Sequence, residues 1–74
     1  MSVSYKKLWH LLLDRDMKKK DLAELSGISP YTINKLNRDG NVTIEVIEKI
    51  CQTLNCKVDD ILEFLKEEER NDYE

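Results

Sequence analysis

The chain has 74 residues and a formal net charge of −3 at pH 7; 41% of its residues are apolar and 36% are charged. This length allows one small domain with a single core, which argues against a deep enzyme pocket. The longest purely apolar run, residues 11–13, is far short of the roughly 20 residues that span a membrane, and no signal-peptide pattern precedes it. We therefore expect a soluble protein of the cytoplasm.

The charges are segregated along the chain. Residues 15–40 hold six basic and four acidic side chains, whereas the segment from Thr43 onward holds four basic and ten acidic ones. Much of the acidic excess lies in residues 67–74, which we expect to be a frayed tail behind a domain of residues 1–66. The middle of the chain could therefore face an anion while the rest of the chain repels it.

The residues that most often carry metal or catalytic chemistry are few and scattered. Cys51, Cys56 and His10 lack the number and the paired spacing of zinc ligands. Cys51 continues the apolar spacing of Ile47 and Ile50, so we expect both cysteines to be small buried hydrophobes and not a disulfide. His10 has no acidic or serine partner at a suggestive spacing. We expect no metal, no cofactor, no small-molecule ligand and no enzymatic activity.

Apolar residues recur at helical spacing in five segments, and no segment has the alternating pattern of a strand. Ser4 can cap a first helix that runs to about residue 15, with an inward stripe of Leu8, Trp9, Leu11, Leu12 and Leu13. A second helix covers about residues 19–26, with Asp21 near the positive end of its dipole and Gly27 as its stop. Its inward residues are Leu22, Ala23 and Leu25.

Three more helices follow. Ser29 and Pro30 are typical of an N-cap and a first turn, so a third helix starts there and runs to about residue 38. Thr43 caps a fourth helix, whose inward face is Val46, Ile47, Ile50, Cys51 and Leu54. A fifth helix is predicted from about Val58, with the inward residues Ile61, Leu62 and Leu65.

The second and third helices, joined by a short turn that contains glycine, form a helix-turn-helix arrangement. Its packing needs a very small side chain where the two helices cross, which Ala23 supplies, and a left-handed residue in the turn, which Gly27 supplies. The later helix needs inward apolar residues, and these are Ile33 and Leu36. All four residues occur in one register.

With "DLAELSGIS" and "TINKL" in that register, the chain resembles the Cro/cI-repressor-type (XRE-like) helix-turn-helix family over about residues 8–65. The segment "VIEKICQTLNCKVDDIL" is similar to the fourth helix, short turn and fifth helix of that family. The resemblance implies an all-α, compact five-helix fold of the lambda-repressor type. It also implies that the third helix enters the major groove of DNA while the N-terminus of the second helix touches the phosphate backbone.

The chain departs from the family pattern in two places. Lys18 stands where members often have Ser, Thr or Asn before the second helix, although Asp21 remains three residues later. Leu12 and Asn37 stand where many members pair an arginine with a glutamate, so an apolar contact is expected in place of the ion pair.

The side of the third helix that faces away from Ile33 and Leu36 carries side chains suited to reading bases. Asn can bond adenine in bidentate fashion, Lys can donate to guanine, and Tyr can reach a phosphate or pack on a thymine methyl. The alternative is an ordinary solvated polar face. The predicted base-reading residues are Tyr31, Asn34, Lys35 and Arg38.

Two further groups could hold phosphates. Ser29 and Thr32 lie near the start of the third helix, where hydroxyl and N–H groups often bind a phosphate oxygen, although Ser29 could be only a cap. Lys18, Lys19 and Lys20 precede or open the second helix, where dipole and ammonium groups would act on the same phosphate. A solubilising charge run is the alternative for this triplet. In the resemblance, Lys19 matches a backbone-contacting position.

The preferred function is sequence-specific binding of double-stranded DNA by a transcriptional regulator, as a repressor in a bacterium, phage or mobile element. A single recognition helix reads few base pairs, so a dimer on a two-fold operator is expected. We expect this dimer to be weak and to form through the fourth and fifth helices, where Phe64 falls beside the inward stripe among acidic residues. The alternative is a protein-interaction module, an antitoxin or adaptor, which the acidic C-terminal half would favour.

Overall fold

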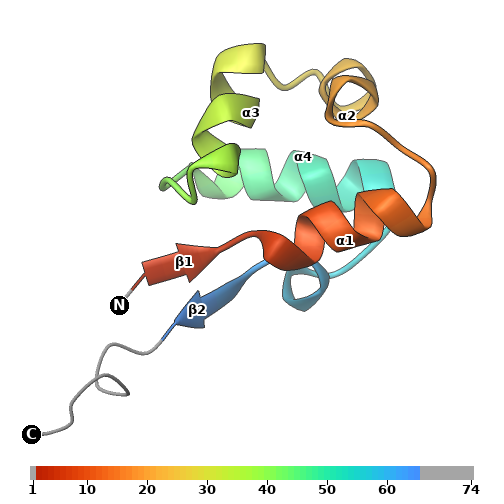
Figure 1. The fold of residues 1–74 in the computed structure, drawn as a ribbon. Helices are drawn as coiled ribbons and strands as arrows, with labels where there is room; N and C mark the ends of the chain where they lie inside the picture. The colour runs from red at the N-terminus through yellow and green to blue at the C-terminus, as the bar shows by residue number, and fades with distance from the viewer. Residues whose placement is uncertain (1, 66–74) are drawn as a thin grey trace, which may run out of the picture.

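The computed structural model describes residues 2–65, which form a mostly helical domain with a small two-stranded sheet (Figure 1). Within these residues no helix combines the length and the apolar character that crossing a membrane requires. The elements in chain order are β1 (Ser2–Ser4), α1 (Lys6–Asp14), α2 (Lys19–Ser26), α3 (Pro30–Asn37), α4 (Ile44–Leu54), the single 3-10 turn η1 (Val58–Asp60) and β2 (Glu63–Leu65). The expected helical helix-turn-helix fold is therefore confirmed, with four α-helices in place of five.

The boundaries of α2, α3 and α4 follow the predicted caps. The Ser29 hydroxyl accepts a hydrogen bond from the amide of Thr32 at 3.2 Å, and the Thr43 hydroxyl accepts one from the amide of Val46 at 3.2 Å. At the start of α2, where Lys18 offers no capping oxygen, its amide donates to the carboxylate of Asp21 at 2.9 Å. Local side-chain to backbone bonds thus set all three helix starts.

The predicted fifth helix is wrong. Residues 58–60 make one 3-10 turn, and the chain then extends into β2, which pairs antiparallel with β1 so that Val3 lies opposite Phe64. β-branched Val58 does not favour a helix, and Asp60 accepts the amide of Lys57 in a local turn. Strand β1 then supplies a partner for an extended chain. Leu65, which was expected inward, is 47% exposed.

The start of α1 also differs from the expectation. Tyr5 occupies the cap position without a side-chain hydrogen bond, and Ser4 belongs to β1. The Ser4 hydroxyl still accepts the amide of Lys6 at 3.3 Å. The strand pairing with β2 therefore takes Ser4 out of the helix and brings the apolar ring of Tyr5 to the helix start.

The core is built from the inward stripes of the helices together with residues of the connections. Leu25 and Leu13, which were expected inside, are exposed, because the stripes of α1 and α2 are narrower than predicted. Ala23 is half-buried and packs against the core beside α3, as expected for the crossing. The buried side chains are Tyr5, Leu8, Leu12, Leu22, Ile28, Ile33, Leu36, Ile47, Ile50, Leu54 and Ile61.

The two cysteines are brought together by the way α4 ends. Asn55 has a left-handed backbone with φ 53°, and the amide of Cys56 donates to the carbonyl of Cys51 at 3.0 Å. In this type of helix ending the two bonded positions also make an apolar side-chain contact. Both cysteines are free thiols, as expected, but they are half-buried and not fully buried. The expected tail, residues 67–74, lies outside the described residues.

Tyr5 joins the N-terminal segment to the loop that follows α3. Its amide donates to the carboxylate of Asp39 at 3.1 Å, and its hydroxyl donates to the carbonyl of Gly40 at 2.9 Å. Burial, and then the negative charge of Asp39, raise the pKa of the Tyr5 hydroxyl above its ordinary value, so the hydroxyl keeps its proton and stays a donor. Neither partner was foreseen from the sequence.

The left-handed turn at Gly27 predicts a specific sensitivity. Its φ is +78°, and an added Cβ would meet nothing within 4 Å, so a Gly27→Ala change costs only backbone strain. We expect a loss of about 1 kcal/mol in the free energy of unfolding, measured by urea denaturation. Gly27→Asn should lose less, because Asn tolerates this conformation. Equal losses for the two variants would contradict the explanation.

The Tyr5 hydroxyl predicts a second stability effect. Tyr5→Phe leaves the carbonyl of Gly40 without its donor, and we expect a loss of about 1 kcal/mol in the free energy of unfolding. Tyr31→Phe is the matched control, because Tyr31 is 69% exposed and should change little. A Tyr5→Phe variant as stable as the control would show that this bond contributes nothing.

Candidate nucleic-acid interface

The outward side of α3 carries the residues predicted to read bases. Ile33 and Leu36 are buried, which turns Tyr31, Asn34 and Arg38 to the surface. These three side chains are exposed and are available to a ligand. The structure therefore agrees with the predicted orientation of α3, in which the polar residues lie opposite its buried pair.

Lys35, the fourth predicted base reader, is half-buried. Its ammonium lies 5.8 Å from the ring centre of Tyr31, one helical turn earlier. Its backbone carbonyl accepts the amide of Gly40 at 2.8 Å, so the loop after α3 folds back against this residue. Lys35 is thus half-buried, with its ammonium near the ring of the exposed Tyr31.

The two hydroxyls at the start of α3 already make hydrogen bonds within the protein. Ser29 accepts the amide of Thr32, and the two side-chain oxygens lie 3.1 Å apart. Ser29 is exposed whereas Thr32 is half-buried. The capping role of Ser29 is therefore observed, and only a remaining lone pair or hydroxyl hydrogen would be available to a phosphate.

The three lysines before and in the first turn of α2 are all exposed, but they differ in their contacts. The ammonium of Lys19 lies 4.3 Å from the ring centre of Trp9 and donates a hydrogen bond to the side-chain oxygen of Asn37. Within residues 2–65 the ammonium groups of Lys18 and Lys20 make no hydrogen bond to the protein. Lys19 is thus a link between α1, α2 and the end of α3, while Lys18 and Lys20 are free to approach a phosphate.

The contact made by Asn37 differs from the prediction. An apolar contact with Leu12 was expected, but the polar side chain of Asn37 is exposed and bonds Lys19, whereas Leu12 is buried in the core. A cation therefore does tie the end of α3 to the rest of the domain. This cation belongs to α2, whereas the family pattern places it on the first helix.

The hydrogen bonds that hold the C-terminal end of α3 were not predicted from the sequence. Tyr5 bonds both Asp39 and Gly40, and Asp39 has a left-handed backbone with φ 56°. The "DG" pair does signal a turn, but its partner lies 34 and 35 positions away in sequence. The bonds of Tyr5 and the bond from Lys19 to Asn37 therefore both stabilise the end of α3 that carries Arg38.

Basic and acidic side chains are concentrated in different parts of the chain, as the sequence predicted. Most of the basic side chains of the described part belong to α2 and α3 or the turns beside them, whereas acids predominate from α4 to β2. Among residues 2–65 no three His, Cys, Asp or Glu side chains gather as a metal site would require. The acids of the second region are Glu45, Glu48, Asp59, Asp60 and Glu63.

Comparison with known proteins agrees with this geometry. The sequence model of a family described as "Cro/C1-type HTH DNA-binding domain" matches residues 7–67. The crystal structure of the transcriptional regulator VanUg is similar, with 52% sequence identity over 89% of this chain and 88% of that chain and a TM-score of 0.85. No curated protein matches the chain. The chain belongs to the Cro/C1-type helix-turn-helix family of DNA-binding domains.

Proposed function

We propose that this protein is a transcriptional repressor that binds specific sequences of double-stranded DNA by inserting α3 into the major groove. The observation that carries the proposal is the polar outward side of α3, which stands opposite the buried Ile33 and Leu36 within a helix-turn-helix. The similarity to VanUg, whose structure is titled as that of a transcriptional regulator, supports the regulatory role. A bound repressor acts by occupying DNA that the polymerase needs.

The exposed face of α3 suits direct readout of base edges. Asn34 can pair with the donor and acceptor of adenine, and Arg38 can do the same with the two acceptors of guanine. Lys35 can donate to guanine O6 or N7, and Tyr31 can pack on a thymine methyl. These four residues span little more than two turns of helix, so one copy reads only a few base pairs.

The N-terminus of α2 is the proposed backbone contact. Lys18 and Lys20 offer free ammonium groups next to the positive end of the helix dipole. Lys19 can join them if its ammonium turns from Asn37 to a phosphate, and Ser29 with Thr32 can hold a second phosphate at the start of α3. Contacts of this kind position α3 in the groove without adding sequence information.

Useful specificity needs two copies. We propose that the protein binds a two-fold operator as a weak homodimer, with half-sites about one helical turn apart. The binding energy of the second half-site then adds to that of the first, because the two α3 helices are held in one assembly. The alternative function, a protein-interaction module, predicts no salt-dependent binding of DNA at all.

The base readers predict a loss of sequence preference. On a site selected from a random duplex library, Asn34→Ala and Lys35→Ala should each lose roughly 1–3 kcal/mol of binding free energy, measured by fluorescence anisotropy. Each variant should also tolerate changes of the base pair that it no longer reads. Lys57→Ala, a change of an exposed lysine before η1, is the control and should bind as the unchanged protein does. If Lys35→Ala keeps both affinity and preference, the assignment of Lys35 fails.

The phosphate contacts predict a different signature. Lys20→Ala should weaken binding to all duplexes alike and lower the slope of log affinity against log salt by about one unit. Lys19→Ala should lose more than that, because Trp9 and Asn37 also lose their common partner. An unchanged salt slope in Lys20→Ala would remove this residue from the interface. A complete absence of DNA binding, even at low salt, would favour the protein-interaction module.

A further inference from the structure

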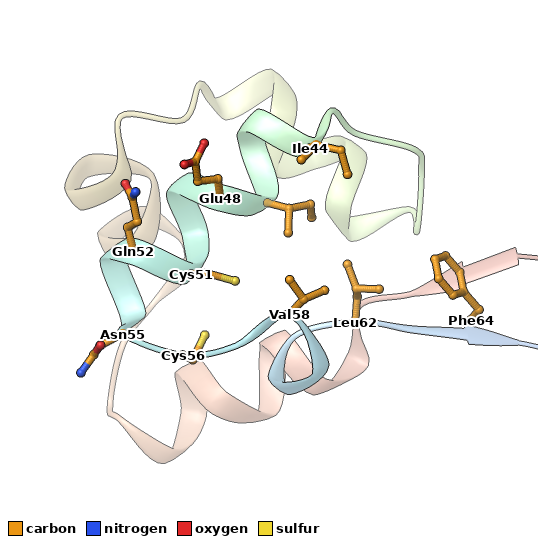
Figure 2. Close-up of a pocket in the computed structure, with 10 residues that line it drawn as sticks. Ile44, Glu48, Cys51, Gln52, Asn55, Cys56, Val58, Leu62 and Phe64 are labelled. Atoms are coloured by element: carbon orange, nitrogen blue, oxygen red, sulfur yellow. The ribbon is translucent and has the colours of Figure 1, made fainter.

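A groove of about 580 Å³ opens along the flank of α4, with η1 and the start of β2 as its opposite wall (Figure 2). Cys51 in α4 and Cys56, two residues after the end of that helix, both line it. Their sulfur atoms point toward each other at one side of the groove. Neither thiol has a part in the proposed contact with DNA, so the pair is a separate chemical feature of the domain.

The backbone at the end of α4 holds the two cysteines together. The left-handed conformation of Asn55, with φ 53°, turns the chain back over the last turn of the helix. The amide of Cys56 then donates to the carbonyl of Cys51 at 3.0 Å. A disulfide joins residues whose Cα atoms lie roughly 4.4–6.8 Å apart, and a main-chain hydrogen bond of this length brings two residues within that reach. The two sulfur atoms can therefore bond without a rearrangement of the main chain.

Contacts on both sides keep this arrangement in place. The guanidinium of Arg15 donates a hydrogen bond to the carbonyl of Leu54, the last residue of α4. After the second cysteine, the amide of Lys57 donates to the carboxylate of Asp60 at 3.0 Å, and Ile61 is buried in the core. The chain is thus anchored before and after the pair. The fold, and not only closeness in sequence, sets the separation of the two thiols.

The surroundings of the pair disfavour a charged thiolate. Burial, and then the neighbouring Cys51, raise the pKa of Cys56 to about 11, and the charge of Asp60 contributes in the same direction. A disulfide carries no charge, so its formation removes both the cost of burying a thiolate and the repulsion between the two sulfur atoms. The site therefore favours chemistry that leaves both cysteines neutral.

We propose that Cys51 and Cys56 form a thiol–disulfide exchange site, at which a small-molecule disulfide oxidises the pair to an intramolecular disulfide. The structure describes the reduced form, in which both thiols are free. No basic residue is among the described residues that line the groove, so a peroxide would find no cation to assist it there. Exchange needs only a thiolate and an accessible disulfide. This chemistry does not depend on DNA binding.

The reaction has two exchange steps. Cys56 keeps its proton at neutral pH, so the thiolate of Cys51 attacks one sulfur of the small disulfide and releases the other half as a thiolate. Cys51 then carries a neutral mixed disulfide and no longer opposes the ionisation of Cys56. Cys56 gives its proton to the solvent, its sulfur attacks that of Cys51, and the second half leaves as a thiolate. The two cysteines lose two electrons and two protons, and the small disulfide becomes two thiols.

The first test treats the full chain, without DNA, with glutathione disulfide and follows the products by mass spectrometry. The chain holds two cysteines, so each product can be assigned. The unchanged protein should lose two hydrogen atoms and retain no glutathione. Retention of glutathione, or a disulfide that forms only between two chains, would overturn the proposal.

Two matched variants separate the steps. Cys56→Ser should stop with one glutathione bound to Cys51, because no second thiol is present to release it. Cys51→Ser should take up glutathione more slowly, because Cys56 is the thiol that keeps its proton. A thermal melt checks that both variants fold. A Cys51→Ser variant that reacts faster than Cys56→Ser would overturn the order of attack.

The second test measures what the fold contributes. In a glutathione buffer, the ratio of disulfide to dithiol should be at least about tenfold higher for the folded protein than for the chain unfolded in concentrated urea, because the fold holds the two thiols together. By thermodynamic linkage, the oxidised protein should then melt at a higher temperature than the reduced protein. Equal ratios in the two states, or a lower melting temperature after oxidation, would overturn the proposal.

Discussion

The presentation of α3 depends on one backbone conformation, the left-handed turn at Gly27. The φ of +78° ends α2 and changes the direction of the chain, so that Ile28 enters the core and Ser29 caps the next helix. A residue with a side chain can keep this conformation, and with it the angle at which α3 leaves the turn, only at a cost in backbone strain. The buried pair Ile33 and Leu36 can point inward only if that angle is kept, and the polar side of α3 faces outward for the same reason.

Two separate sets of contacts then stabilise the C-terminal end of α3. Lys19 bonds Asn37 from α2 while its ammonium lies over the ring of Trp9, and Tyr5 bonds the loop residues Asp39 and Gly40. The helix is therefore held at its start by the turn and at its end by side chains from α2 and from the N-terminal segment. The proposed reading of base edges by α3 needs this rigidity, because hydrogen bonds to bases form only when the donors are placed close to the ideal geometry.

The charged side chains of the described residues are divided between two regions. The basic groups concentrate on α2 and α3, whereas acids predominate from α4 to β2, a region that also carries an apolar groove lined by Ile44 and Phe64 among others. The net charge of −3 for the whole chain hides this division among the described residues. In the proposed function, such a distribution favours the approach of DNA to α2 and α3.

The sequence by itself determined the features that depend on neighbours three or four residues away. The caps at Ser29 and Thr43, the stop at Gly27 and the inward stripe of α3 were all predicted, because each is a local bond or a local period. Only the tertiary structure decided the contacts between distant segments, such as the β1–β2 pair, the bonds of Tyr5 and the link from Lys19 to Asn37. It also decided that Leu25 stays outside and that Phe64 projects beside a groove. Periodicity indicates which side of a helix is apolar, but the neighbours that cover that side are chosen by the packing of the whole chain.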